Sequence, residues 1–96
     1  MHATIRWYEG VVGTTEELAE AARQLASTLS QSRGFVSWVV LKAEAGVFAT
    51  VSIFEDRTSL GQADQVAEAS LLEQWGRLIS EDPQVISGEI VFQRGL

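Results

Sequence analysis

The sequence predicts an α+β fold in which a four-stranded antiparallel sheet carries two helices on one face. Three observations support this prediction. Four segments alternate in side-chain character or are rich in β-branched and aromatic residues, as strands are. Two longer segments repeat apolar residues at helical spacing, one after the first strand segment and one after the third. Joined by right-handed crossovers, this βαββαβ order is that of the ferredoxin-like class.

The first predicted strand spans residues 3–9. Its side chains alternate, with Ile5 and Trp7 on one side and Arg6 and Tyr8 on the other. The glycines that follow mark a turn before the first helix.

The first helix has a start signal, an apolar stripe and a stop signal. Thr14 and Glu17 have the spacing of a capping box. Apolar residues then recur at helical spacing at Leu18, Ala22, Leu25 and Leu29. Gly34 ends the segment.

The second and third strands are predicted as a hairpin. Residues 35–41 (FVSWVVL) and 47–54 (VFATVSIF) flank a connection that contains Gly46. The second helix then begins after Asp56 or Thr58, either of which can cap it, and ends before Pro83. Its apolar stripe comprises Leu60, Ala63, Ala67, Leu71, Trp75 and Leu78. The last strand is predicted over residues 85–93.

Strands two and three are apolar on both faces, which predicts a homodimer. In strand two, Phe35, Val39 and Leu41 alternate with Val36, Trp38 and Val40. In strand three, Val47, Ala49, Val51 and Ile53 face away from Phe48, Thr50, Ser52 and Phe54. Two helices cover only one face, so a second copy of the sheet is the economical cover for the other. The alternatives are a loop, the termini or a wet ligand groove.

Composition excludes several classes of partner and site. The 96 residues are long enough for one core, so we expect a single ferredoxin-like domain over residues 1–96. A formal charge of −6 repels phosphate backbones and anionic headgroups, so neither nucleic acid nor a membrane is an expected partner. The absence of cysteine excludes disulfides and cysteine-held metals. With no leader pattern and no apolar run that could span a bilayer, a cytoplasmic location is expected.

Several short motifs accompany this order of elements. They are Gly34-Phe35 opening strand two, residues 51–57 (VSIFEDR) leading into helix two, and Pro83 and Val85 followed by Gly88-Glu89. With them the chain resembles the antibiotic-biosynthesis-monooxygenase-like group of dimeric α/β-barrel proteins, and within it a small bacterial branch. The resemblance implies a homodimer whose sheets face each other, with a mostly apolar cavity between the sheet and the helices of each subunit.

The resemblance does not extend to a known active site. Members of the group include cofactor-free quinone-forming oxygenases, haem-degrading enzymes and proteins with no known activity. The haem-degrading members use a histidine on helix two and an asparagine on strand one. This chain has no asparagine, and its one histidine is His2, which we expect to be solvated and without a role. We therefore expect no haem, flavin or metal cofactor, and the catalytic residues stay unknown.

Four residues are candidates for binding a small apolar or aromatic molecule: Trp7, Trp38, Trp75 and Ser52. Tryptophan can stack on a flat ring and donate its N–H to a developing oxyanion. Trp75, on the apolar stripe beside Gly76, is the best cavity candidate. The alternative is that the tryptophans are large core or interface residues.

Polar residues of the strands have two interpretations each. Ser52 and Thr50 mark a polar spot in a cavity, or their hydroxyl groups bond to nearby backbone. Arg6 and Glu89, on neighbouring strands, form a cross-strand ion pair or anchor an anionic substrate.

Two functions of different class stay open. The first is a dimeric binding protein that lacks a complete active-site set. The alternative is a cofactor-independent monooxygenase for an aromatic or polyketide-like substrate, which would have to be electron-rich enough to react with oxygen itself. The missing catalytic residues favour the first, and the tryptophans keep the second open.

Overall fold

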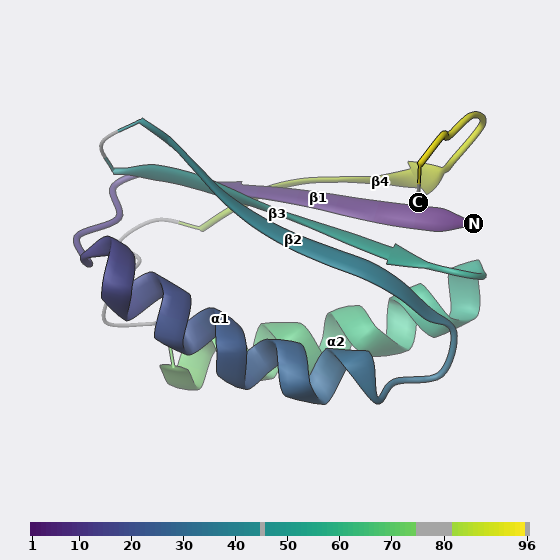
Figure 1. The fold of residues 1–96 in the computed structure, drawn as a ribbon, viewed down its shortest axis with the longest axis horizontal. Coiled ribbons are helices and arrows are strands. Elements are labelled where there is room, and N and C mark those ends of the chain that lie inside the picture. The colour runs from purple at the N-terminus through teal and green to yellow at the C-terminus, as the bar shows by residue number, and fades with distance from the viewer. Residues whose placement is uncertain (45, 75–81, 96) are drawn as a thin grey trace.

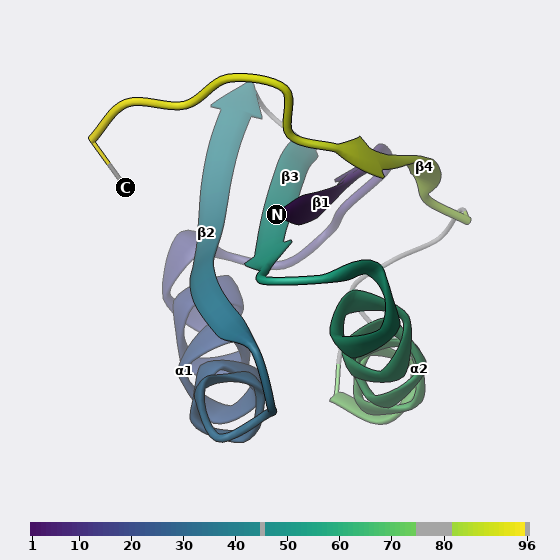
Figure 2. The same ribbon diagram turned by 90° about the vertical axis from the view of Figure 1, so that its right-hand side faces the viewer.

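The elements follow one another in the predicted order in a computed structural model that describes residues 1–44, 46–74 and 82–95. They are β1 (His2–Tyr8), α1 (Thr15–Ser30), β2 (Phe35–Glu44), β3 (Val47–Phe54), α2 (Arg57–Gln74) and β4 (Gln84–Glu89). The sheet order is β2-β3-β1-β4 with antiparallel neighbours, and both helices lie on one face (Figures 1 and 2). The predicted ferredoxin-like α+β fold is confirmed.

The start of α1 is fixed by the predicted capping box. The Thr14 hydroxyl accepts from the Glu17 backbone N–H at 3.1 Å, and the Glu17 carboxylate accepts from the Thr14 backbone N–H at 3.2 Å. Two backbone donors that the first helical turn leaves unpaired are thereby satisfied. One face of the helix then buries Leu18, Leu25 and Leu29 against the sheet and α2.

The start of α2 is fixed by Asp56 and by close packing on Gly34. Asp56 Oδ1 accepts from the Ser59 backbone N–H at 2.8 Å, and this bond holds the pKa of Asp56 below its usual value. Gly34 has φ +78°, and a Cβ there would lie 2.8 Å from Ser59 Oγ, so only glycine fits. The predicted helix residues beyond Gln74 lie outside the described residues.

The helices cover one face of the sheet and leave the other face open. On β3, Phe48, Thr50, Ser52 and Phe54 are buried under the helices, whereas the residues between them lie on the open face. Figure 1 shows both helices on one side of the sheet and neither on the other. The predicted alternation of β3 is therefore the one observed.

Strand β2 departs from the predicted alternation at one residue. A register shift between Phe35 and Ser37 places Phe35 opposite Phe54, on the helix side, where the two rings pack edge to face at 5.7 Å. The sequence placed Phe35 with Val39 and Leu41, which lie on the open face. The prediction was wrong because a bulge adds one residue and reverses the side of everything before it.

Strand β4 is shorter than predicted. Its pairing with β1 ends at Glu89 opposite His2, and the Ile90 backbone N–H donates to the Met1 carbonyl at 2.9 Å. The chain then leaves the ladder and lies on the side of the sheet away from the helices (Figures 1 and 2), with Val91 and Phe92 exposed. None of the described helices is long and apolar enough to cross a membrane.

Candidate functional site

The helix-facing side of β1 is polar, the reverse of an ordinary core strand. Thr4 and Arg6 are buried there, and Thr50 and Ser52 continue this polar surface on β3. The apolar residues Ile5 and Trp7 point to the opposite, open face. Since buried polar side chains need partners, a polar centre between sheet and helices marks a structural network or a site.

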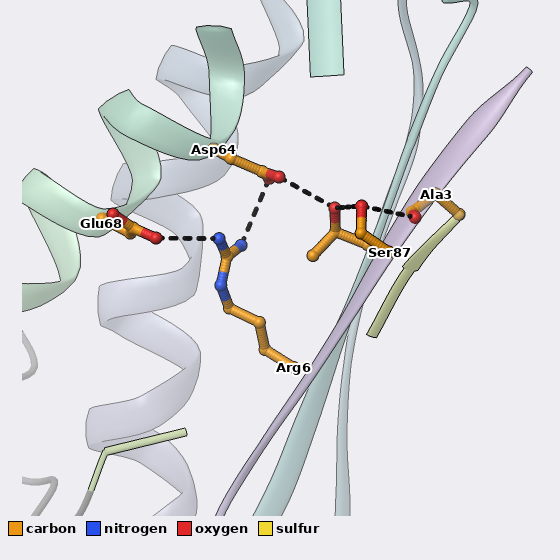
Figure 3. A network of polar contacts seen from close by, with 6 residues as sticks. Ala3, Arg6, Asp64, Glu68 and Ser87 are labelled. Carbon is orange, nitrogen blue, oxygen red and sulfur yellow. Dashed lines mark hydrogen bonds and ion pairs between the residues drawn. The ribbon is translucent and has the colours of Figure 1, made fainter. Parts of the chain in front are cut away.

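Arg6 is the centre of this network. Its side chain is only 4% exposed, and its guanidinium lies 3.3 Å from Asp64 Oδ1 and 3.4 Å from Glu68 Oε1 on α2 (Figure 3). Asp64 is 21% exposed and Glu68 66%, so Asp64 is the partner screened less by water. The ion pairs join the central strand to α2.

Two hydroxyl groups extend the network to β4. The Thr4 hydroxyl donates to Asp64 Oδ2 at 2.9 Å and lies 3.0 Å from the Ser87 hydroxyl. Because Thr4 has one hydroxyl proton and gives it to Asp64, Ser87 must donate either to Thr4 or to the Ala3 carbonyl at 3.4 Å. Asp64 thus accepts from β1 through both carboxylate oxygens (Figure 3).

A pocket of about 370 Å³ adjoins the network. Its strand wall is formed by His2, Ser87, Gly88 and Glu89, and its α2 wall by Arg57, Leu60, Gly61 and Asp64. His2, expected to be solvated, is half-buried at the start of β1, which pairs with a strand on each side from this residue on. Its Nδ1 is buried and has no hydrogen-bond partner in the described part of the chain.

Tyr8 lies at the other end of β1 in the apolar core. Its ring stacks on Phe48 with centroids 4.6 Å apart and planes 11° from parallel. Burial raises the pKa of Tyr8 to about 12 because the phenolate would lose its hydration, although the nearby Arg6 charge opposes this rise. The phenol is therefore neutral at physiological pH.

The ionisation of Tyr8 is directly measurable because it is the one tyrosine of the chain. We expect its ultraviolet absorbance to change near pH 12 rather than near 10.0, the ordinary value. In an unfolded chain the tyrosine ionises from about pH 10. The contribution of the buried, neutral Tyr8 to the free energy of unfolding is therefore complete below that pH and is lost as pH rises toward 12. Circular dichroism over the same range is the control. A phenolate signal near pH 10 in protein that is still folded would contradict the burial of Tyr8.

A second cavity, which we call the β2 groove, lies between α1 and β2 and has a volume of about 410 Å³. Its apolar lining comprises Leu18, Ala19, Ala22 and Ala26 of α1, Trp38, Val40 and Leu41 of β2, and Phe48 of β3. The groove exists because α1 presents three alanines to the strand, which are too short to fill the space. A volume of this size is within the range of small-molecule sites.

Three polar residues, Thr15, Arg23 and Lys42, also line the β2 groove. Lys42 Nζ donates to Thr15 Oγ1 at 3.1 Å, which holds the ammonium group beside the first turn of α1. Arg23 forms an ion pair with Glu20 at 2.7 Å.

The structure separates the residues proposed from sequence as ligand contacts. Trp38 lines the β2 groove, and Ser52 lies buried on the same face, opposite Trp38 in the β2–β3 register. Trp7 lies on the open face of the sheet. Trp75 lies outside the described residues.

The predicted pairing of Arg6 with Glu89 is wrong. In the β1–β4 register Arg6 lies opposite Val85, and Glu89 lies opposite His2. The partners of Arg6 are Asp64 and Glu68, neither of which was predicted as a site residue. Their spacing of four residues along a helix was a usable signal, because it places two carboxylates on one helix face.

The described residues contain no group of three histidine, aspartate or glutamate side chains placed to hold a metal ion. The acceptors of Asp64 are engaged by Thr4 and Arg6. The expectation of no metal, haem or flavin stays a prediction.

No family model matches the sequence, and no curated protein matches it either. Solved structures do match its fold. A protein of unknown function from Nitrosomonas europaea is 21% identical, with a TM-score of 0.80 over 99% of this chain and 93% of the other. A candidate antibiotic biosynthesis monooxygenase from the same organism is 14% identical, with a TM-score of 0.80 over 98% and 93% of the two chains.

A third match has a described activity. SnoaB, a cofactor-independent oxygenase from Streptomyces nogalater, is 16% identical, with a TM-score of 0.70 over 96% of this chain and 95% of the other. At these identities the likeness is one of fold. The fold of antibiotic-biosynthesis-monooxygenase-like proteins, predicted from the sequence motifs, is confirmed, and function has to be argued from the sites.

Proposed function

We propose that this protein is a homodimer that binds a small apolar or aromatic molecule in the β2 groove. The observation that carries the proposal is the groove itself, a cavity of about 410 Å³ with Trp38 in its wall and mostly aliphatic side chains around it. A flat ring stacked on Trp38 would bury apolar area on both partners.

The open face of the sheet supports the homodimer. Ile5 of β1, Val39 and Leu41 of β2 and Ile86 of β4 are exposed there. The half-buried Val51 of β3 lies between Val39 and Ile5. A continuous apolar face of this kind is unusual on a small soluble monomer, and a second copy of the face is its natural cover. The segment after β4, in which Val91 and Phe92 are exposed, lies on the same side of the sheet (Figure 1) and extends the apolar surface.

Ligand binding is tested by tryptophan fluorescence. We expect naphthoquinone, a flat aromatic quencher, to quench the wild-type emission saturably, because it stacks on Trp38. Trp38→Phe should lose most of the saturable response while the far-ultraviolet circular dichroism is unchanged.

Two matched variants locate the site. Trp7→Phe removes a tryptophan of the open face, and Trp75→Phe removes the residue preferred from sequence; both should keep the saturable response. Loss of the response in Trp75→Phe alone would show that the ligand binds at Trp75 and not in the β2 groove. A linear, collisional response in the wild type would argue against any ligand site.

A second candidate function, a cofactor-independent oxygenase, is favoured by the pocket beside the Arg6 network. Such an enzyme needs a base to convert its substrate into an electron-rich anion. His2 lies in the wall of that pocket, and its Nδ1 is buried without a hydrogen-bond partner among the described residues. The test is oxygen uptake with anthrone, which consumes one O₂ to give anthraquinone and water. A rate above the spontaneous one that His2→Gln abolishes would support this function, and a rate equal to the spontaneous one would count against it.

A further inference from the structure

The β2 groove contains a charge asymmetry that its apolar lining does not require. Among the residues that the structure describes, no aspartate or glutamate lines it, although the chain has 13 acidic residues, whereas two of the seven basic residues do. A binding site with a cation at one end and an apolar surface at the other selects amphipathic anions.

The two cations differ in availability. Arg23 forms an ion pair with Glu20 at 2.7 Å, so a carboxylate already lies beside its guanidinium. Lys42 donates to the neutral hydroxyl of Thr15 and forms no ion pair with any residue in the described ranges. An ammonium group has three donors, so two remain for a ligand.

The position of Lys42 is set by its strand and by α1. Its register partner is Phe48, so it follows Trp38 and Val40 on the helix side of β2. The bond to Thr15 places the ammonium group at the N-terminal end of α1, where the helix dipole adds positive potential. Glu16 and Glu17 belong to the same turn, but neither lines the groove.

We propose that the β2 groove takes an aromatic anion, a carboxylate or phenolate, whose ring stacks on Trp38 and whose oxygen accepts from Lys42. This inference rests on the proposed function, because it names the class of ligand for the same groove. The aliphatic wall and Trp38 supply apolar contact, and the positive charge of Lys42 makes the groove prefer an anion.

The test compares naphthoate with naphthamide, which have the same ring system and nearly the same shape but differ in charge. Binding is followed by nuclear magnetic resonance titration of backbone amides in low salt. In the wild type, naphthoate should bind about fivefold more tightly than naphthamide, the ratio expected for one partly exposed ion pair. In Lys42→Met the two affinities should become equal through weaker binding of naphthoate, and Lys42→Arg should restore the preference.

Arg33→Gln is the matched control. It removes one positive charge from an exposed residue that lines neither pocket, so it should keep the preference for naphthoate. Equal loss in Arg33→Gln and Lys42→Met, or an undiminished preference in Lys42→Met, would overturn the assignment of Lys42. Equal binding of both compounds by the wild type would overturn the anion preference and leave the proposed groove intact. Binding of neither would overturn both.

Discussion

Replacing Val39 with glutamate should convert the proposed homodimer of about 21 kDa, twice the chain mass of 10.5 kDa, into a folded monomer. Val39 lies in the middle of β2 on the open face and is 48% exposed in the single chain. A glutamate there is solvated in the monomer but would be buried without a partner between two apolar sheets. At about 2 kcal/mol or more for each of the two symmetric copies, the dissociation constant should rise about 1,000-fold or more.

The matched control for this variant is Val66→Glu. Val66 is 43% exposed, close to the value for Val39, but it lies on α2 on the other side of the sheet. It should leave the dimer intact. Light scattering at micromolar concentration, with circular dichroism as a check on folding, gives the result. A wild-type mass of one chain, or dissociation by both variants alike, would contradict an interface at the open face.

Replacing Asp64 with alanine should lower the free energy of unfolding by about 3 kcal/mol. The cost arises because Arg6 is 4% exposed and would keep only Glu68, a partner that is itself mostly in water. The Thr4 hydroxyl would lose its acceptor in the same step. Urea denaturation measures the effect at one fixed protein concentration, because the stability of the proposed dimer would depend on concentration.

Two variants separate a buried charge from a general effect on α2. Glu68→Ala removes the exposed partner of the same guanidinium, so it should cost about 1 kcal/mol or less. Arg6→Met combined with Asp64→Ala should be more stable than Asp64→Ala alone, because the unpaired charge is removed and an apolar side chain of similar length replaces it. Equal costs for the two carboxylates, or a double variant that is less stable than Asp64→Ala, would show that the ion pair is not the cause.

The helix starts, the strand positions and their order were readable from the sequence, because each depends on local signals. The capping box at Thr14 and Glu17 acts within four residues, and residues 47–54 form a strand with the predicted bounds. The two-sided apolar character of β3 was also visible, since alternation fixes which residues share a face. Alternation along the strand did not show which of the two faces the helices cover.

Only the tertiary structure decided the faces and the partners of the polar residues. The bulge after Phe35 moves that residue to the helix side, and no local signal in the sequence announces it. Arg6 meets Asp64, 58 positions away, because α2 crosses over the central strand. The sequence also pointed to Trp75, whereas the described cavity with a tryptophan in its wall forms at Trp38, where three alanines of α1 leave space. Spacing along the chain determines what lies on one element, whereas a cavity or an ion pair between elements depends on how they pack, and packing is a property of all of them together.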